Sequence, residues 1–260
     1  MKNLQTDKTD QDTTTKKQVE VMVEIKDLEK GFGNLKVLKK INLKLYKGEN
    51  LVVLGKSGSG KSVLIKCIVR LLNPDSGSIE VLGNEVSTMN KKALSEVRKK
   101  VGFLFQSGAL YDSMTVKQNL EFPLKRIRKD LSKDEIHEKV KEALENVGLA
   151  DALNKMPSEL SGGMRKRISL ARTIVVDPLI MLYDEPTTGL DPVTSDEISA
   201  LINEVQKKYK TSSIIITHDI ECARATADRI VMLKDGEVYT EGTIEEFNQS
   251  KDPLIQSFFK

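Results

Sequence analysis

Short apolar runs separated by polar stretches predict a strand-rich beginning for this chain. The clearest run is the continuous apolar segment at residues 51–54, which follows a predicted turn at residues 47–50. In order, the pattern predicts strands at residues 19–25, 41–46 and 51–54, a helix at 62–72, a strand at 78–81, a helix at about 91–100 and a strand at 101–105. Strands therefore dominate the start and then alternate with helices.

The sequence becomes charged and helix-periodic between residues 114 and 157. Ile136, Val140, Leu144 and Val147 recur every three or four residues, which is typical of the buried face of a helix. Alternation then resumes, with a helix predicted at residues 162–176, a strand at 179–183, a helix at 193–209 and a strand at 213–217. Continuous apolar strands between helices predict an α/β fold whose parallel sheet is covered on both faces, with an inserted helical lobe.

Composition limits the kind of protein this can be. Of the 260 residues 39% are apolar, and no apolar run approaches the roughly 20 residues that span a bilayer, so we expect a soluble chain. Residues 1–18 are mostly Thr, Lys, Asp and Gln, which predicts a disordered polar tail rather than a secretory signal. The 41 Lys plus Arg and 38 Asp plus Glu are interspersed, which argues against a nucleic acid partner.

The two cysteines indicate the compartment. Cys67 and Cys222 lie in helix-like segments without a Cys-x-x-Cys pair or a Cys/His cluster. Buried free thiols in a reducing compartment are therefore favoured over a disulfide or a metal site, and we expect the chain to be cytoplasmic.

A phosphate-binding loop joins the apolar strand at residues 51–54 to the helix that follows. The segment Gly55-Lys56-Ser57-Gly58-Ser59-Gly60-Lys61-Ser62 fits the pattern G-x-x-x-x-G-K-[ST]. Its glycines allow successive N–H groups to converge on phosphate oxygens, and the helix adds its positive end. We expect Lys61 to reach the β- and γ-phosphates and the Ser62 hydroxyl to bind magnesium.

An acidic pair follows the apolar strand at residues 179–183. Asp184 and Glu185 would then lie at the carboxyl end of a strand, where α/β sheets bind their ligands. With a phosphate loop upstream, Asp184 is predicted to hold the magnesium shell and Glu185 to polarise the attacking water. Without that loop the pair would be read equally well as a polar turn.

Two more polar side chains follow predicted strands. His218 comes after the strand at residues 213–217 and can contact the γ-phosphate, although a strand-end histidine with purely local bonds is the alternative. Gln106 comes after the strand at residues 101–105 and offers a neutral oxygen to magnesium or a hydrogen bond to the water. Phe32, between two glycines, is either a stacking platform for the nucleobase or an exposed turn aromatic.

The segment Leu160-Ser161-Gly162-Gly163-Met164 precedes another predicted helix. Ser161 is a suitable N-cap, and the positive end of the capped helix suits a phosphate group. The run Arg165-Lys166-Arg167 opposes the helix dipole, so either nearby nucleotide charge offsets it or these residues form a solvated basic turn.

Taken in order, these motifs resemble those of the ATP-binding-cassette (ABC) ATPases. The resemblance covers about residues 20–241 and includes the phosphate loop, Gln106, the Leu-Ser-Gly-Gly segment, Asp184-Glu185, Gly189-Leu190-Asp191 and His218. It implies a P-loop NTPase fold with a RecA-like core, an antiparallel β subdomain and a helical subdomain inserted at about residues 107–177. It also implies ATP and Mg²⁺ as cofactors.

In that family two cassettes close head to tail around ATP. The resemblance therefore implies a homodimer in which Ser161 and Gly163 contact the γ-phosphate bound by the other subunit, while Asp191 communicates across the interface. An integral membrane permease is the further partner that it implies.

A narrower resemblance is to the Mla/Mce-type ATPases, which drive lipid transport across the bacterial envelope. It rests on Met164 in place of the usual glutamine, on the three basic residues after it, and on the segments at residues 105–116 and 183–192. It implies a location at the cytoplasmic face of the inner membrane and a possible Mce-domain substrate-binding protein. An ATPase of another importer, such as one for amino acids, and a soluble ABC protein without a permease are the alternatives.

Two surfaces are candidates for partner contacts. Leu110, Tyr111, Met114 and Phe122 gather just after Gln106, where the helical lobe meets the core, although Phe122 can equally be lobe core. Residues 243–260 form an amphipathic extension that could dock on its own subunit, on the dimer mate or on the membrane protein.

Overall fold

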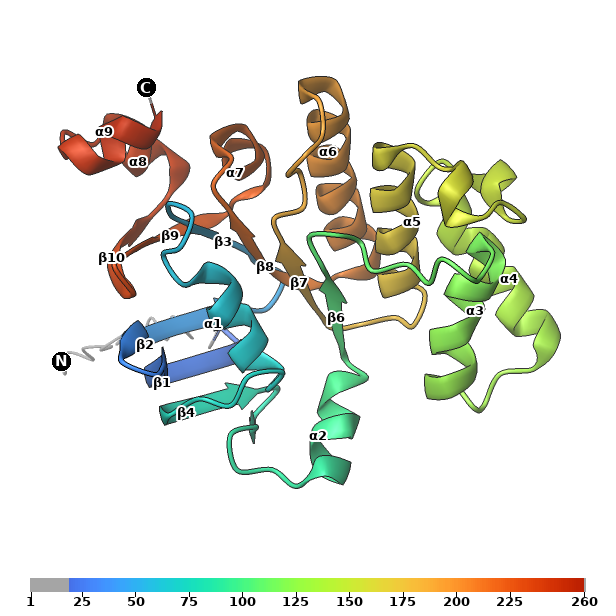
Figure 1. Ribbon diagram of the computed structural model, residues 1–260, viewed down its shortest axis with the longest axis horizontal. Coiled ribbons are helices and arrows are strands. Elements are labelled where there is room, and N and C mark those ends of the chain that lie inside the picture. The colour runs from blue at the N-terminus through green and yellow to red at the C-terminus, as the bar shows by residue number, and fades with distance from the viewer. Residues whose placement is uncertain (1–18, 260) are drawn as a thin grey trace, which may run out of the picture.

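Two sheets form the framework of the computed structural model, which describes residues 19–259 (Figure 1). One has four strands in the order β2-β1-β4-β5, and the other has six in the order β10-β9-β3-β8-β7-β6. The strands are β1 (Val21–Phe32), β2 (Leu35–Tyr46), β3 (Asn50–Leu54), β4 (Ser76–Val81), β5 (Asn84–Glu85), β6 (Val101–Leu104), β7 (Ile180–Asp184), β8 (Ser212–Thr217), β9 (Arg229–Lys234) and β10 (Glu237–Gly242). The predicted disordered tail at residues 1–18 lies outside the described residues.

Helices cover the six-stranded sheet and extend beyond it on one side. They are α1 (Lys61–Ile68), α2 (Lys91–Arg98), α3 (Val116–Ile127), α4 (Lys133–Glu145), α5 (Gly162–Ile174), α6 (Pro192–Tyr209), α7 (Ile220–Thr226), α8 (Ile244–Gln249) and α9 (Pro253–Phe259), with short 3-10 turns η1 (Ala150–Ala152) and η2 (Pro157–Glu159). Figure 1 shows α5, α6 and α7 on one side of this sheet, and the four-stranded sheet with α1 and α2 on the other. The predicted α/β fold is confirmed.

Strand β3 shows why its sequence is apolar at each position from Leu51 to Leu54. Val52 and Leu54 pack into the core that contains the helical segment, whereas Leu51 and Val53 pack into the core shared with the four-stranded sheet. A strand buried on both faces needs apolar residues at successive positions, unlike a strand with one solvated face. The pairing of β3 with β8 and β9, of β8 with β7, and of β7 with β6 is parallel, as expected.

Strand β1 is longer than its sequence pattern predicts, because it contains irregularities. The pairing of β1 with β2 shifts register around Asp27, which has a φ of 47°. Each shift moves later side chains to the other face and so breaks the two-residue alternation. Phe32 is consequently the last residue of a strand rather than part of a turn.

Strands β9 and β10 were not predicted. Strands β9 and β10 pair antiparallel around Asp235 and Gly236, whose φ values are 52° and 83°. An Asp-Gly pair between an apolar run and a run of alternating apolar and polar residues is a recognised hairpin signal. The sequence alone could therefore have predicted this hairpin.

The segment between β6 and β7 is helical, as expected. The predicted periodic positions Ile136, Val140, Leu144 and Val147 are all buried in one core. Helix α4 begins with a capping box in which the Ser132 hydroxyl accepts from the Glu135 N–H. In Figure 1 α3 and α4 lie at one end of the molecule, and α8 and α9 lie at the opposite end.

The C-terminal helices pack on their own subunit. Arg224 of α7 donates a hydrogen bond of 3.3 Å to the Phe259 backbone oxygen, and its guanidinium lies 5.4 Å from the Phe259 ring centroid. The rings of Phe247 and Phe259 are 5.6 Å apart, and Ile255 is buried. These contacts support the first of the three docking alternatives for this extension.

Both cysteines are free and buried, as predicted. Cys67 lies in α1 and Cys222 in α7. Burial raises the pKa of each thiol to about 11. The reactive thiolate is therefore scarce at neutral pH, and both side chains serve as small apolar core residues. None of the helices in residues 19–259 has both the length and the apolar character that crossing a bilayer would require.

Tyr183 in β7 offers a test of the core. Its side chain is fully buried and its hydroxyl has no hydrogen-bond partner, and burial raises the pKa of this phenol. Since an unpaired buried hydroxyl costs about 1 to 3 kcal/mol, we expect Tyr183→Phe to leave the free energy of unfolding unchanged or to raise it by up to that amount. Urea denaturation measures the difference, and a loss above about 1 kcal/mol would mean that the hydroxyl has a partner in solution.

Candidate functional site

Part of the phosphate loop meets Gln106, Glu185 and His218 in one hollow of ≈ 360 Å³. We call it the P-loop hollow; it is lined by Val37, Ser57, Gly58, Gly60, Lys61, Ser62, Val63, Gln106, Glu185 and His218. Apart from Val37 of β2, these residues follow the carboxyl ends of β3, β6, β7 and β8, which parallel pairing brings to one edge of the sheet.

The phosphate loop has a backbone that requires glycine. Gly58 and Gly60 have φ values of 82° and 101°. A Cβ on Gly55 would lie 2.6 Å from the Leu233 backbone oxygen, and one on Gly60 would lie 2.8 Å from the Leu38 side chain. Side chains at these positions would therefore strain the loop or push it off its neighbours, and the loop could not keep its backbone close to a phosphate chain.

Lys61 is folded back over this loop. Its ammonium donates to the backbone oxygens of Gly55 (2.8 Å) and Lys56 (3.2 Å), and it lies 3.4 Å from the Glu185 carboxylate. Only 5% of this residue is exposed. A buried lysine at the mouth of a phosphate cradle, held by weak neutral acceptors, can exchange those acceptors for phosphate oxygens.

The proposed magnesium residues are placed to act together. The Ser62 hydroxyl donates to the Asp184 carboxylate at 2.9 Å, and the Gln106 side chain borders the same hollow. Residues 19–259 contain no group of three His, Cys, Asp or Glu side chains that could hold a metal. The oxygens of Ser62, Asp184 and Gln106 nevertheless fit Mg²⁺, because this ion is usually held by only one or two carboxylates together with substrate phosphates and waters. When bound, the ion would neutralise phosphate charge.

Glu185 has a backbone conformation that is costly for a residue with a Cβ. Its φ is 51°, in the left-handed region. The conformation is held from both sides, because its N–H donates to the Ile216 oxygen at 3.0 Å and its side chain is bonded to neighbouring groups. Its carboxylate lies 2.8 Å from His218 Nδ1 and accepts from the Thr188 hydroxyl at 3.2 Å. The carboxylate is thus fixed at the edge of the hollow and oriented by a histidine.

Lys166 is a site residue that the sequence did not single out. It lies in the second turn of α5 and is 7% exposed, so the solvated basic turn is wrong for this residue. Its ammonium donates to the backbone oxygens of Gln106 (2.5 Å) and Glu185 (3.4 Å). Burial lowers the pKa of Lys166, whereas the carboxylates of Asp184 and Glu185 act in the opposite direction. Its burial depends on tertiary packing, which the local pattern of basic residues does not reveal.

The other two basic residues of this run have structural partners. Arg165 donates to the Leu160 backbone oxygen at 2.9 Å, and Arg167 pairs with Glu197 of α6. Both bonds hold α5 to its surroundings, and neither reaches the P-loop hollow.

The segment at residues 160–164 stands apart from the P-loop hollow. Ser161 caps α5 as predicted, since its hydroxyl accepts from the Met164 N–H at 3.2 Å. Neither Ser161 nor Gly163 lines the hollow, and Ser161 is exposed. A Cβ on Gly163 would lie 2.6 Å from the Thr194 side chain, so α6 packs closely against the start of α5. Within one chain the capped helix end and the phosphate loop therefore do not form a common site.

Phe32 is likewise outside the hollow. Its side chain is 47% exposed at the end of β1, and the Lys30 ammonium lies 5.3 Å from the ring centroid. An exposed ring is available for stacking, and Val37 of the adjacent β2 borders the hollow.

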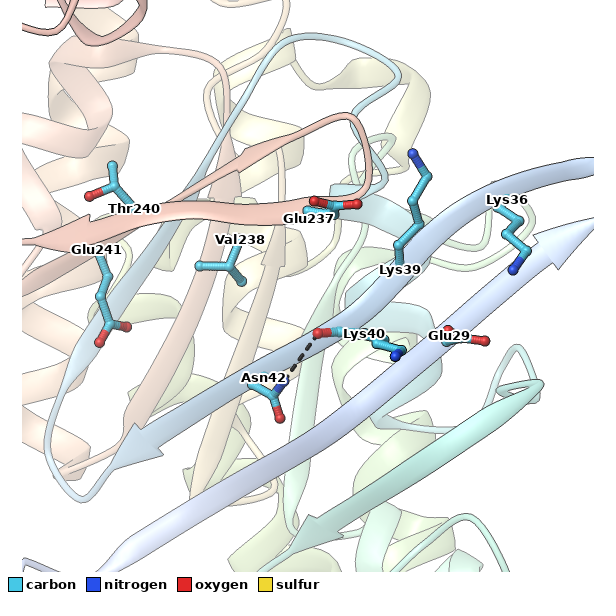
Figure 2. A pocket seen from close by; sticks show the side chains of 9 residues that line it. All are labelled: Glu29, Lys36, Lys39, Lys40, Asn42, Glu237, Val238, Thr240 and Glu241. Carbon is cyan, nitrogen blue, oxygen red and sulfur yellow. Dashed lines mark hydrogen bonds between the residues drawn. The ribbon is translucent and has the colours of Figure 1, made fainter.

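A larger hollow lies elsewhere on the described surface. It measures ≈ 720 Å³ and lies between β2 and β10. Figure 2 shows Lys36 and Lys39 of β2 pointing in different directions, and Asn42 bonded to the Lys40 backbone oxygen. Because its charged groups do not converge, this hollow has no arrangement for catalysis.

A third hollow, of ≈ 480 Å³, is apolar and lies between β6, α3 and α5. We call it the α3–α5 groove; its lining includes Phe105, Ala109, Tyr111, Phe122, Ile127, Arg172 and Val176. The rings of Tyr111 and Phe122 meet edge to face with centroids 5.2 Å apart, and both are partly exposed. Phe122 is therefore a wall of a groove, not interior core of the helical segment.

Comparison with known proteins identifies the family. The profile of the ABC transporter family matches residues 38–188, more than half of the chain. The chain therefore belongs to the ABC transporter family, its fold is that of an ABC ATPase cassette, and its cofactors are ATP and Mg²⁺.

The chain is similar in sequence to proteins whose names refer to different compounds. The chain is 40% identical to the probable ribonucleotide transport ATP-binding protein mkl of Mycobacterium leprae (92% of this chain, 68% of that protein). It is 37% identical to Protein TRIGALACTOSYLDIACYLGLYCEROL 3, chloroplastic, of Arabidopsis thaliana (92% and 73%). It is 36% identical to the methionine import ATP-binding protein MetN of Brucella abortus (92% and 64%), so it spans less than two thirds of that relative's length.

Solved structures agree with this placement. The dimeric cassette MJ0796 has a TM-score of 0.80 and 33% identity, covering 86% of this chain and 99% of that chain. The same cassette has been solved in a post-hydrolysis dimeric state with ADP and Pi (TM-score 0.78, 34% identity, 86% and 99% covered). The cassette cbiO1 from Clostridium perfringens, part of the transporter complex cbiONQ, has a TM-score of 0.81 and 30% identity, with 91% and 94% covered.

The bond between Ser62 and Asp184 gives a prediction about magnesium. We expect Ser62→Ala to raise the Mg²⁺ concentration for half-maximal ATP hydrolysis by about tenfold, because a hard oxygen ligand is lost while the phosphate loop remains. Hydrolysis measured against Mg²⁺ at saturating ATP tests this. Ser76→Ala removes a surface hydroxyl bonded to Glu29 and is the control; equal Mg²⁺ requirements in the two variants would contradict the assignment.

Proposed function

We propose that this chain hydrolyses ATP as the motor subunit of an ABC transporter that moves phospholipid or another lipid across the bacterial envelope. The observation that carries the hydrolytic part is the fixed carboxylate of Glu185 between His218 and Lys61 in the P-loop hollow.

Glu185 is the general base in this proposal. Its carboxylate takes a proton from a water molecule as the water oxygen bonds to the γ-phosphorus and the bond to the bridging oxygen breaks, giving ADP and phosphate. His218 orients that carboxylate and contacts the γ-phosphate, while Gln106 positions the water or binds Mg²⁺. Lys61 stabilises the charge that develops on the phosphate oxygens.

A second copy of the chain completes each ATP site. Support comes from the separation of Ser161 and Gly163 from the P-loop hollow of their own chain, and from the dimeric state of the related cassette MJ0796. The capped N-terminus of α5 carries partial positive charge and exposed N–H groups, which suit a γ-phosphate presented by the other subunit. Asp191, which caps α6 beside this segment, would carry contacts across the same interface.

A membrane permease is the second partner, and the α3–α5 groove is the surface that we assign to it. The groove combines exposed aromatic rings with apolar walls, as surfaces that bury a partner helix do. The chain would then sit peripherally at the cytoplasmic face of the inner membrane, with no nucleic acid partner. An Mce-domain substrate-binding protein is a possible further component of the assembly.

Lipid as the substrate class rests on sequence. Met164 and the basic run after it, together with residues 105–116, carry the likeness to Mla/Mce-type ATPases. The name of the Arabidopsis relative refers to a galactolipid, which supports this class. The MetN relative imports methionine, so an amino-acid importer is the second candidate.

The hydrolytic proposal predicts a trapped dimer. Glu185→Gln should still bind ATP but turn it over at least about a hundredfold more slowly, because the amide cannot accept the proton. Size-exclusion chromatography with ATP and Mg²⁺ should show a stable dimer. Ser161→Arg is the companion variant, in which a subunit binds ATP but hydrolysis is lost; steady-state turnover near wild type in Glu185→Gln would exclude Glu185 as the base.

The transport proposal predicts what copurifies with the chain. After mild detergent solubilisation, affinity purification should recover a multi-pass permease together with bound phospholipid, identified by mass spectrometry. Tyr111→Glu in the α3–α5 groove should release the permease while ATP binding persists, because it places a charge on an apolar contact. Recovery of an amino-acid permease without lipid would favour the second candidate, and recovery of soluble partners alone would exclude transport.

A further inference from the structure

Helix α5 presents a row of side chains to the backbone that follows Gln106. Lys166 donates to the backbone oxygen of Gln106 itself. Arg172, nearly two turns later, donates to the backbone oxygens of Ala109 (2.7 Å) and Gly108 (3.2 Å). Between them Ser169 is fully buried, and a Cβ on Gly108 would lie 2.5 Å from its hydroxyl oxygen. The loop from Gln106 to Ala109 is therefore fastened along one face of this helix.

Lys166 differs from the other members of this row because it also reaches the catalytic strand. Its second acceptor is the backbone oxygen of Glu185, the residue with the left-handed backbone. The N–H of Glu185 is bound by β8, so Lys166 secures the opposite side of the same residue. One ammonium thus ties together the two backbone segments that carry Gln106 and Glu185.

The two ends of this arrangement face different nucleotides. On the proposed function, Ser161 and Gly163 at the start of α5 contact the ATP held by the partner subunit. Lys166 is in the next turn of the same helix and bonds to the backbone of Gln106 and Glu185, the residues proposed to act on this subunit's own ATP. A short rigid helix segment therefore connects the two ATP sites of the dimer.

We propose that Lys166 is a positioning residue that transmits engagement of the partner's ATP at the start of α5 to Gln106 and Glu185 of its own subunit. The inference rests on the proposed function, since it requires the head-to-tail dimer. A buried ammonium suits this task because it has three donors and bonds strongly to backbone oxygens, whereas an apolar residue would leave both oxygens without this contact. Displacement of α5 then moves both acceptors together.

Removing the donors should slow chemistry without weakening assembly. We expect Lys166→Met, which keeps most of the length of the side chain, to lower kcat for ATP by about ten- to a hundredfold, because small displacements of catalytic groups have effects of that size. The KM for ATP should change by less than about threefold, because the phosphate loop is untouched. Lys166→Gln, which keeps two N–H donors, should recover part of the loss.

A measurement of dimer formation distinguishes a positioning role of Lys166 from a merely structural one. In the Glu185→Gln background, Lys166→Met should form the ATP-dependent dimer at the same ATP concentration as Glu185→Gln alone. Lys125→Met on α3 is the matched control, since Lys125 is an exposed lysine paired with Glu121 and its removal should change kcat by less than about twofold. Thermal unfolding of each variant checks that it folds, and Lys166→Gln carries the test if Lys166→Met does not fold.

Two results would overturn the inference. One is a kcat for Lys166→Met and Lys166→Gln that equals wild type. The other is a loss of dimer formation in proportion to the loss of hydrolysis, which would mean that Lys166 only supports the start of α5. Failure of Glu185→Gln alone to form a dimer would instead count against the proposed function, so the two failures are distinguishable.

Discussion

The parallel pairing of β3, β7 and β8 is the constraint on which the site depends. Leu54 pairs with Thr217, and Asp184 pairs with Ile216, so the three strands end at nearly the same height. The residues that follow these strands are the phosphate loop, Glu185 and His218, and they meet because their strands stop together. A shift of one residue in any of these pairings would turn the following side chains away from the hollow. The apolar run Leu51–Leu54 of β3 therefore helps to place the phosphate loop, because its burial on both faces fixes this register.

Most of the P-loop hollow could be predicted, because its residues are specified by local sequence. The phosphate loop, Asp184-Glu185, Gln106 and His218 each follow a short apolar run, and strand ends of a parallel sheet share one edge. The α/β fold and the buried helical positions were predictable for the same reason, since periodicity is a local property. Strand β1 was only half predicted, because the left-handed residue Asp27 interrupts its alternation.

Lys166 shows what local sequence cannot reveal. The sequence gives no reason to distinguish three consecutive basic residues near the start of a helix. In the structure, however, Arg165 and Arg167 bond to nearby groups, whereas Lys166 is buried beside the catalytic residues. The difference arises from the direction in which each side chain leaves α5 and from the approach of the Gln106 loop, both of which are tertiary features. The separation of Ser161 from the P-loop hollow is similar, because only the assembled fold decides which side of the helix end is exposed.

Charge explains why the site is built from paired groups. Lys61, Lys166, Asp184 and Glu185 are all buried, and an isolated buried charge is costly enough to shift its protonation or to unfold the site. Each cation here has acceptors within hydrogen-bonding reach, and Glu185 is shared between Lys61 and His218. The positive and negative charges of these four residues nearly cancel when no nucleotide is bound. Binding of a polyanionic phosphate chain with its metal changes the net charge of the site. Lys61 can then leave its backbone acceptors for phosphate, while Lys166, held by backbone oxygens away from the loop, keeps its contacts. Because Lys166 keeps these contacts, a displacement of α5 can still reach Gln106 and Glu185 after Lys61 has turned to the phosphates.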